Sequence, residues 1–270
     1  MIMPKKRQGE DLISLMARAT SVVGGVVEAM CRRTSPRVQA MGAAPKIPQA
    51  RRQGILTLEM PVAEGWKDGR LPICADGPKV NVFAEDLDHP RWIEVLPNRD
   101  VLVSQSKEQP APPRSLMDHS AQATMRRVKA IGKSANRVTL LRDEDADGAA
   151  ETRYVFVQGQ NQLLGMSLFG NRFYLDDTDR IKIFDYSPGA TRLKGDGCTF
   201  VTFKHHRHWT RSLIFSPDRT KIYAGVGSLT NSADQGMEAE EGRGAIWELD
   251  FAAQEAWLFA TGLRNPVGMA

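Results

Sequence analysis

Residues 208–214, HWTRSLI, begin with polar and aromatic side chains and continue as an apolar run, and a turn then leads into a second apolar run at Ile222–Ala224. The same arrangement begins at residues 87–93 and again at residues 160–166, and residues 263–270, LRNPVGMA, resemble the start of a fourth copy. A repeated opening of this kind predicts an array of similar β units. We expect the strand-opening residues of such an array to gather at one place.

The spacing of the copies indicates which kind of array this is. Matching positions are separated by 73, 48 and 55 residues. These positions are Pro90, Leu163, Arg211 and Pro266. Short runs rich in Val, Ile, Phe and Tyr between turn signals are typical of an all-β protein, and a pitch of roughly 50 matches the four-stranded blades of a β-propeller. We expect about three to three and a half blades from Lys79 onward, and a β-sandwich is the alternative fold.

The composition changes along the chain and predicts three regions. Residues 1–43 lack strand alternation and are expected to form a helical or disordered leader. Residues 44–78 are rich in Pro and Gly and are expected to wrap over a surface as an extended segment, with one strand-like run at Gly54–Met60. Residues 79–270 are expected to form the partial propeller, in which a helical insertion near residues 113–133 explains the longest interval. Because propellers close as rings of about four to eight blades, this many blades should leave an apolar face uncovered.

Composition and charge exclude several classes of protein. The chain has 270 residues, of which 41% are hydrophobic, and a net charge of +4. Its Lys and Arg residues are scattered, so we expect no nucleic-acid partner. Cys31, Cys74 and Cys198 are isolated and lack the spacing of a disulfide framework or a zinc site. Residues 11–31 are interrupted by charges and give no clean signal peptide, and no run approaches the roughly 18 to 20 apolar residues of a membrane-spanning helix.

Polar side chains at the strand openings are the candidates for chemistry, because strand openings in a propeller converge on one rim of the central channel. The candidates are His89, Arg91, Gln160, Asn161, His208, Arg211, Arg264 and Asn265. A histidine beside arginines suits general-base catalysis, since its ordinary pKa is about 6.5 and nearby positive charge favours the neutral form. An arginine can stabilise a developing oxyanion. The competing interpretation is that these side chains form hydrogen bonds between blades.

Two segments raise the question of a bound metal ion. On a strand, His206 and His208 would share one face and could supply two ligands, but no third ligand stands at a readable spacing. Asp143–Gly148 alternates acidic residues up to a glycine, like the first half of a calcium loop. Tyr154 stands at the twelfth position in place of the usual Glu. A solvated hairpin turn is therefore favoured there over a bound ion.

Seven stretches carry a resemblance to a known family. They are Leu87–Arg91, Val95–Asn98, Thr139–Asp143, His208–Arg211, Ile214–Asp218, Gly236–Arg243 and Gly262–Gly268. On these stretches the chain resembles the soluble pyrroloquinoline-quinone-dependent sugar dehydrogenases, and most closely the sorbosone dehydrogenase branch, and the resemblance covers about residues 44–270. The resemblance implies a six-bladed propeller that holds the quinone over the channel mouth, with calcium bridging the quinone to the protein.

The resemblance also implies roles for particular residues. It places the catalytic base at His208, which would take a proton from the sugar hydroxyl as hydride passes to the quinone. Arg264 and Asn265 match the pair beside the quinone carbonyl, and Gln160 matches a substrate-binding glutamine. In the glucose-oxidising branch an acidic residue supports the histidine from a turn that is Gly227-Ser228 here. The residue that orients His208 is therefore unassigned.

The function implied is quinone-dependent oxidation of a sugar or aldose, with an electron acceptor as partner and a periplasmic location. The family's calcium ligands and further quinone-binding residues would follow Ala270, so we expect these residues alone to have negligible activity. One alternative is a calcium-dependent lactonase-type propeller, in which the channel holds a metal-activated water. The other is a propeller that binds a partner without catalysis.

Overall fold

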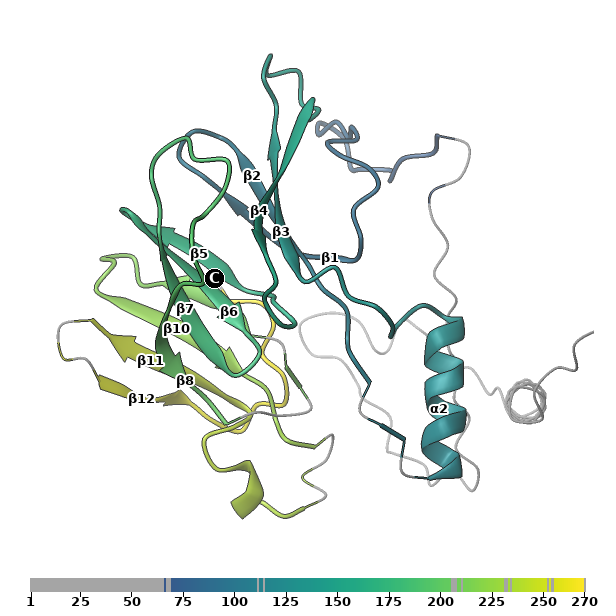
Figure 1. Cartoon of the computed structure of the whole chain (residues 1–270), viewed down its shortest axis with the longest axis vertical. Helices are drawn as coiled ribbons and strands as arrows, with labels where there is room; N and C mark the ends of the chain where they lie inside the picture. The colour runs from purple at the N-terminus through teal and green to yellow at the C-terminus, as the bar shows by residue number, and fades with distance from the viewer. Residues whose placement is uncertain are drawn as a thin grey trace, which may run out of the picture. The chain divides into compact units, whose positions relative to one another are not determined.

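The computed structural model divides the chain into two compact units (Figure 1). One comprises residues 1–65 and 110–132, and the other comprises residues 66–109 and 133–270. The residues that the structure describes are 66, 69–110, 112–113, 115–204, 208–209, 211–230, 233, 235–251, 253 and 255–269. The expected leader, the strand-like run at Gly54–Met60 and the candidate ligand His206 lie outside these residues.

The larger unit contains, among its described residues, three four-stranded antiparallel sheets in which the strands follow one another in chain order. The first sheet consists of β1 (Pro90–Val95), β2 (Val101–Gln105), β3 (Arg137–Arg142) and β4 (Thr152–Gln158). The second consists of β5 (Met166–Phe169), β6 (Arg172–Asp177), β7 (Arg180–Asp185) and β8 (Cys198–Thr202). The third consists of β9 (Leu213–Phe215), β10 (Lys221–Val226), β11 (Ala245–Asp250) and β12 (Glu255–Ala260). Three successive sheets of this kind confirm the predicted propeller blades and exclude the β-sandwich.

The smaller unit contains one described α-helix, α2 (Leu116–Arg127), within the segment where an insertion was expected. Ser115 caps its N-terminus by accepting a hydrogen bond from the amide of Asp118 at 3.0 Å. Arg126 and Arg127 in the last turn complement the helix dipole. No helix among the described residues is long and apolar enough to cross a membrane.

The three sheets are joined along their first strands, because β5 contacts both β1 and β9. Between the first and second sheets, the hydroxyl of Ser104 donates to the carbonyl of Leu164 at 2.9 Å, and Glu94 accepts from the amide of Leu168 at 3.2 Å. Between the second and third, the amide of Gly165 donates to the carbonyl of Arg211 at 2.9 Å. The segments that precede β5 and β9 are therefore fixed against their neighbours.

Two apolar cores fill the spaces between neighbouring sheets. Phe173 and Leu175 of β6 belong to the first core, together with residues of the first sheet such as Leu102. Tyr174, which points to the opposite face of β6, packs in the second core with Ile222 and other residues of the third sheet. β6 is buried on both faces for this reason. Each buried apolar side chain stabilises the fold by about 1.5–3 kcal/mol.

The last strand carries exposed apolar side chains. Trp257 is 38% exposed, Leu258 is 41% exposed and Phe259 is 60% exposed. Residues 261–269 form no strand, although the sequence suggested that a fourth unit begins there. The amide of Leu263 instead donates to the carbonyl of Gly244 at 2.7 Å, so this segment runs along loops of the third sheet.

The junction between the second and third sheets can be tested at Gly165. A Cβ atom added there would lie 2.3 Å from the carbonyl oxygen of Arg211 and 2.9 Å from the amide nitrogen of Leu213. Because both neighbours are main-chain atoms, they cannot turn aside, and we expect Gly165→Ala to lower the free energy of unfolding by about 1–3 kcal/mol. Urea denaturation measures this. Gly268→Ala, where an added Cβ meets nothing within 4 Å, is the matched control, and equal effects of the two substitutions would contradict the prediction.

Candidate functional site

His208 is held through one nitrogen of its ring. Its Nδ1 lies 2.9 Å from the carbonyl oxygen of Ser228 and 3.1 Å from the Ser228 hydroxyl oxygen. A carbonyl oxygen only accepts, so Nδ1 is the donor and carries the proton. The Ser228 hydroxyl donates to the carbonyl of Thr230 at 2.6 Å, which leaves its oxygen able to accept as well. The neutral ring therefore presents the lone pair of Nε2, as a general base requires.

The partner that orients His208 is thus a main-chain carbonyl in the turn after β10. The sequence left this partner unassigned because a carbonyl belongs to every residue and has no signature. A carbonyl fixes the tautomer and the ring orientation as a carboxylate would. It carries no full negative charge, so it stabilises the protonated ring less than a carboxylate does.

The same turn brings Arg264 and Asn265 to His208. The amide of Ser228 donates to the carbonyl of Arg264 at 2.7 Å. A Cβ added to Gly227 would lie 2.4 Å from the Cβ of His208 and 2.8 Å from the Oδ1 of Asn265, so both residues pack closely against this glycine. Three of the sequence candidates therefore gather at the end of β10, as expected for strand openings on one rim.

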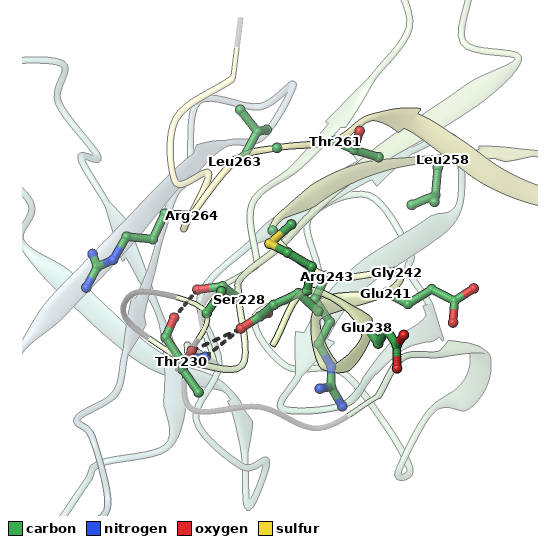
Figure 2. A pocket seen from close by; sticks show the side chains of 15 residues that line it. Ser228, Thr230, Glu238, Glu241, Gly242, Arg243, Leu258, Thr261, Leu263 and Arg264 are labelled. Atoms are coloured by element: carbon green, nitrogen blue, oxygen red, sulfur yellow. Dashed lines mark hydrogen bonds between the residues drawn. The ribbon is translucent and has the colours of Figure 1, made fainter. Parts of the chain in front are cut away.

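A cavity of about 770 Å³ adjoins this group (Figure 2). Its wall includes Met237, Leu258 and Leu263, which offer apolar surface, and the exposed carboxylates of Glu238 and Glu241. Figure 2 shows the side chain of Arg264 directed away from these two carboxylates. A cavity with apolar walls and carboxylate acceptors suits a small molecule with several hydroxyl groups.

Glu240 shapes the wall of this cavity beside Ser228. Its carboxylate accepts from the amide of Leu229 at 2.7 Å and from the amide of Thr230 at 3.0 Å. It also accepts from the Thr230 hydroxyl at 3.1 Å. The carboxylate therefore fixes the chain directly after Ser228 and is already occupied by protein donors.

Gln160 lies in a separate hydrogen-bond network of the second sheet. It is buried, and its Oε1 accepts from the Nζ of Lys182 at 2.8 Å. Lys182 also pairs with Asp177 at 3.0 Å, and Asp177 accepts from the amide of Asn161 at 2.6 Å. The amide oxygen of Gln160 is thus bound within its own sheet, while its role toward a substrate stays a prediction.

The first sheet reaches the segment beside His208 through Arg91. The guanidinium carbon of Arg91 lies 5.4 Å from the centre of the Trp209 ring, and its Nε donates to the carbonyl of Ser106 at 3.0 Å. His89 precedes this arginine, and its pKa is lowered by burial and by the positive charges of Arg91 and Lys107. Positive charge from a neighbouring arginine, which we expected to favour the neutral form of a histidine, therefore acts on His89.

Arg211 lies inside the protein rather than on an open rim. Its side chain is 1% exposed, and its Nη1 lies 3.4 Å from the Oδ1 of Asp176, which is fully buried. Arg211 was a candidate from the sequence, whereas Asp176 was not. The only signal in the sequence was a pair of acidic residues, Asp176 and Asp177, at the end of an apolar strand.

The hairpin between β3 and β4 gathers carboxylates. Oxygen atoms of Asp143, Asp145, Asp147 and Glu151 all lie within 4.8 Å of one another, an arrangement that could hold a metal ion. Glu151 joins the group at the ninth position of the loop, which the sequence pattern missed. In the strand register, β3 pairs with β2 so that this hairpin lies at the end of the sheet away from Pro90. The cluster is therefore remote from the start of β1, where Arg91 meets Trp209.

Comparison with known proteins gives the fold. The holo form of the PQQ domain of pyranose dehydrogenase from Coprinopsis cinerea matches with a TM-score of 0.53 and 21% identity, over 70% of this chain and 42% of its own. The calcium structure of a family AA12 carbohydrate-active enzyme from Trichoderma reesei matches with a TM-score of 0.56 and 18% identity, over 73% and 46%. The chain thus spans less than half the length of these structures. No protein-family model and no curated protein matches it.

The tautomer of His208 is a direct test of the site geometry. We expect its neutral ring to be protonated at Nδ1, because that nitrogen donates to Ser228. Nitrogen-15 NMR of histidine-labelled protein distinguishes the two tautomers, and His208→Gln assigns the signal. We expect Gly227→Ala to remove the preference for the Nδ1-protonated tautomer, because the added methyl group would displace His208 from Ser228. Gly268→Ala should leave this preference unchanged. A ring protonated at Nε2 would contradict the assigned geometry.

Proposed function

We propose that these residues form part of a pyrroloquinoline-quinone-dependent dehydrogenase that oxidises a sugar or aldose, of the sorbosone or glucose type. The observation that carries the proposal is the attachment of His208, Arg264 and Asn265 to the turn at Gly227 and Ser228. The ring of His208 with its available Nε2, the main chain of Arg264 and the side chain of Asn265 thus meet the same turn at one end of a propeller sheet. The matched domain from Coprinopsis cinerea, whose name includes PQQ, supports the cofactor.

In this proposal His208 accepts the proton of the substrate hydroxyl at Nε2. The hydrogen bond from Nδ1 to the Ser228 carbonyl holds the ring in the orientation and tautomer that this transfer needs. The cavity beside Ser228 supplies carboxylate acceptors for other hydroxyl groups of the sugar and apolar surface for its ring carbons.

Arg264 and Asn265 are suited to form part of a quinone-binding site. When bound, pyrroloquinoline quinone supplies the acceptor for hydride. The guanidinium of Arg264 and the amide of Asn265 are hydrogen-bond donors of the kind that hold carbonyl and carboxylate oxygens. The carboxylates of the β3–β4 hairpin do not fit a calcium ion shared with the quinone, because they lie at the opposite end of the first sheet. We therefore assign no ligand of that calcium among the described residues. The proposal includes an electron acceptor and a periplasmic location, which the family resemblance implies.

The role of His208 is tested in the full-length polypeptide that contains these residues. Reduction of an artificial dye is measured with aldoses, pyrroloquinoline quinone and calcium. We expect His208→Ala to lower kcat by roughly 10²–10⁴-fold, the usual contribution of a general base. His119→Ala, which removes an exposed histidine of α2, should leave the rate unchanged.

Two results would overturn the proposal. Absence of quinone-dependent sugar oxidation in the unsubstituted full-length polypeptide would exclude the reaction, and hydrolysis of lactones without added quinone would favour the lactonase-type alternative. Normal turnover in His208→Ala would exclude His208 as the base.

A further inference from the structure

The ion pair between Asp176 and Arg211 has poor geometry for a buried pair. The closest distance is 3.4 Å, whereas a charge-assisted hydrogen bond is usually about 2.7–2.9 Å. The Nε of Arg211 and the Oδ2 of Asp176 are buried, and no hydrogen-bond partner for either occurs among the described residues. Buried polar atoms without partners destabilise a fold.

Burial affects both members of this pair. It raises the pKa of the Asp176 carboxyl, although the charge of Arg211 acts in the opposite direction. It lowers the pKa of the Arg211 guanidinium against the attraction of Asp176. Both pKa shifts indicate that the loss of hydration on burial outweighs the attraction between Asp176 and Arg211. The face of Phe203, 5.3 Å from the guanidinium, offsets part of this loss. An apolar pair of similar volume would suit the fold as well or better.

Arg211 nevertheless makes contacts that an apolar side chain could not make. Its Nη1 also donates to the main-chain carbonyl of Trp209, at 3.4 Å. Trp209 is buried, packs under Arg91, and directly follows His208. The main-chain carbonyl of Arg211 itself accepts from Gly165 of the second sheet. The guanidinium of Arg211 thus connects the buried Asp176 to the main chain next to His208, the candidate base.

We propose that Asp176 and Arg211 are positioning residues for His208. Asp176 faces the guanidinium of Arg211, whose Nη1 contacts the carbonyl of Trp209 and thereby constrains the main chain next to His208. The positioning is a property of the fold, and its consequence for catalysis rests on the proposed function. The pair need not stabilise the fold, and its role in this proposal is to position the main chain at Trp209.

The test replaces both charges at once. In the double variant Asp176→Leu/Arg211→Met, we expect a melting temperature equal to or above that of the unsubstituted protein. We expect the main-chain amides of residues 208–212 to exchange hydrogen roughly tenfold faster, because a hydrogen bond from a charged donor is lost. Mass spectrometry of a peptide covering these residues measures the exchange. If the protein is active, kcat should fall more than KM changes.

A single conservative variant keeps the test valid if the double variant does not fold. Arg211→Lys retains a positive charge beside Asp176 but lacks the Nη1 atom, which contacts both Asp176 and the carbonyl of Trp209. We expect its amides at 208–212 to exchange faster than those of the unsubstituted protein. The control is Arg142→Lys, which alters the bidentate pair with Asp100 (2.7 Å for each bond) in the first sheet. This control should lower the melting temperature and leave exchange at 208–212 unchanged.

The outcomes separate the two proposals. Unchanged exchange at 208–212 in Arg211→Lys and in the double variant would overturn the positioning role. A folded double variant with a strongly lowered melting temperature would also overturn it, since the pair would then serve stability. If the unsubstituted full-length polypeptide oxidises no sugar with quinone, the proposed function fails, and the exchange experiment still decides the positioning role.

Discussion

The candidate site depends on Ser228, whose main chain binds two distant parts of the protein. Its carbonyl accepts from the ring of His208, and its amide donates to the carbonyl of Arg264. Gly227 permits the close approach, since any side chain there would overlap His208. The site is therefore set by the path of the turn after β10, and Glu240 fixes that path from the other side by binding the amides of Leu229 and Thr230.

Much of the fold could be predicted from the sequence because each blade carries its own local pattern. The apolar runs around Phe173 and Ile222 give strands, and the turns between them give antiparallel pairs within one sheet. The path of residues 261–269 could not be predicted in this way. A strand needs a neighbouring strand to satisfy its main chain, and here loop groups of Gly244 and Ser228 satisfy it instead.

The sequence indicated which side chains would gather but not what holds them. His208, Arg264 and Asn265 come together because all three stand beside strand ends of the third sheet. The orienting carbonyl of Ser228 has no sequence signature. Asp176 is hidden for another reason, since an acidic residue at the end of a strand usually meets water and here is fully buried.

The orienting carbonyl of Ser228 and the buried pair of Asp176 and Arg211 are physically related. A carboxylate beside a histidine attracts the protonated ring over several ångströms and tolerates small shifts, whereas a neutral carbonyl acts only through a short, well-aligned hydrogen bond. A base oriented by the Ser228 carbonyl therefore depends more on the placement of its main chain. The guanidinium of Arg211, bound to the carbonyl next to His208, supplies that placement from the interior. A buried charge pair that contacts the main chain next to the base is then the expected companion of an uncharged orienting group.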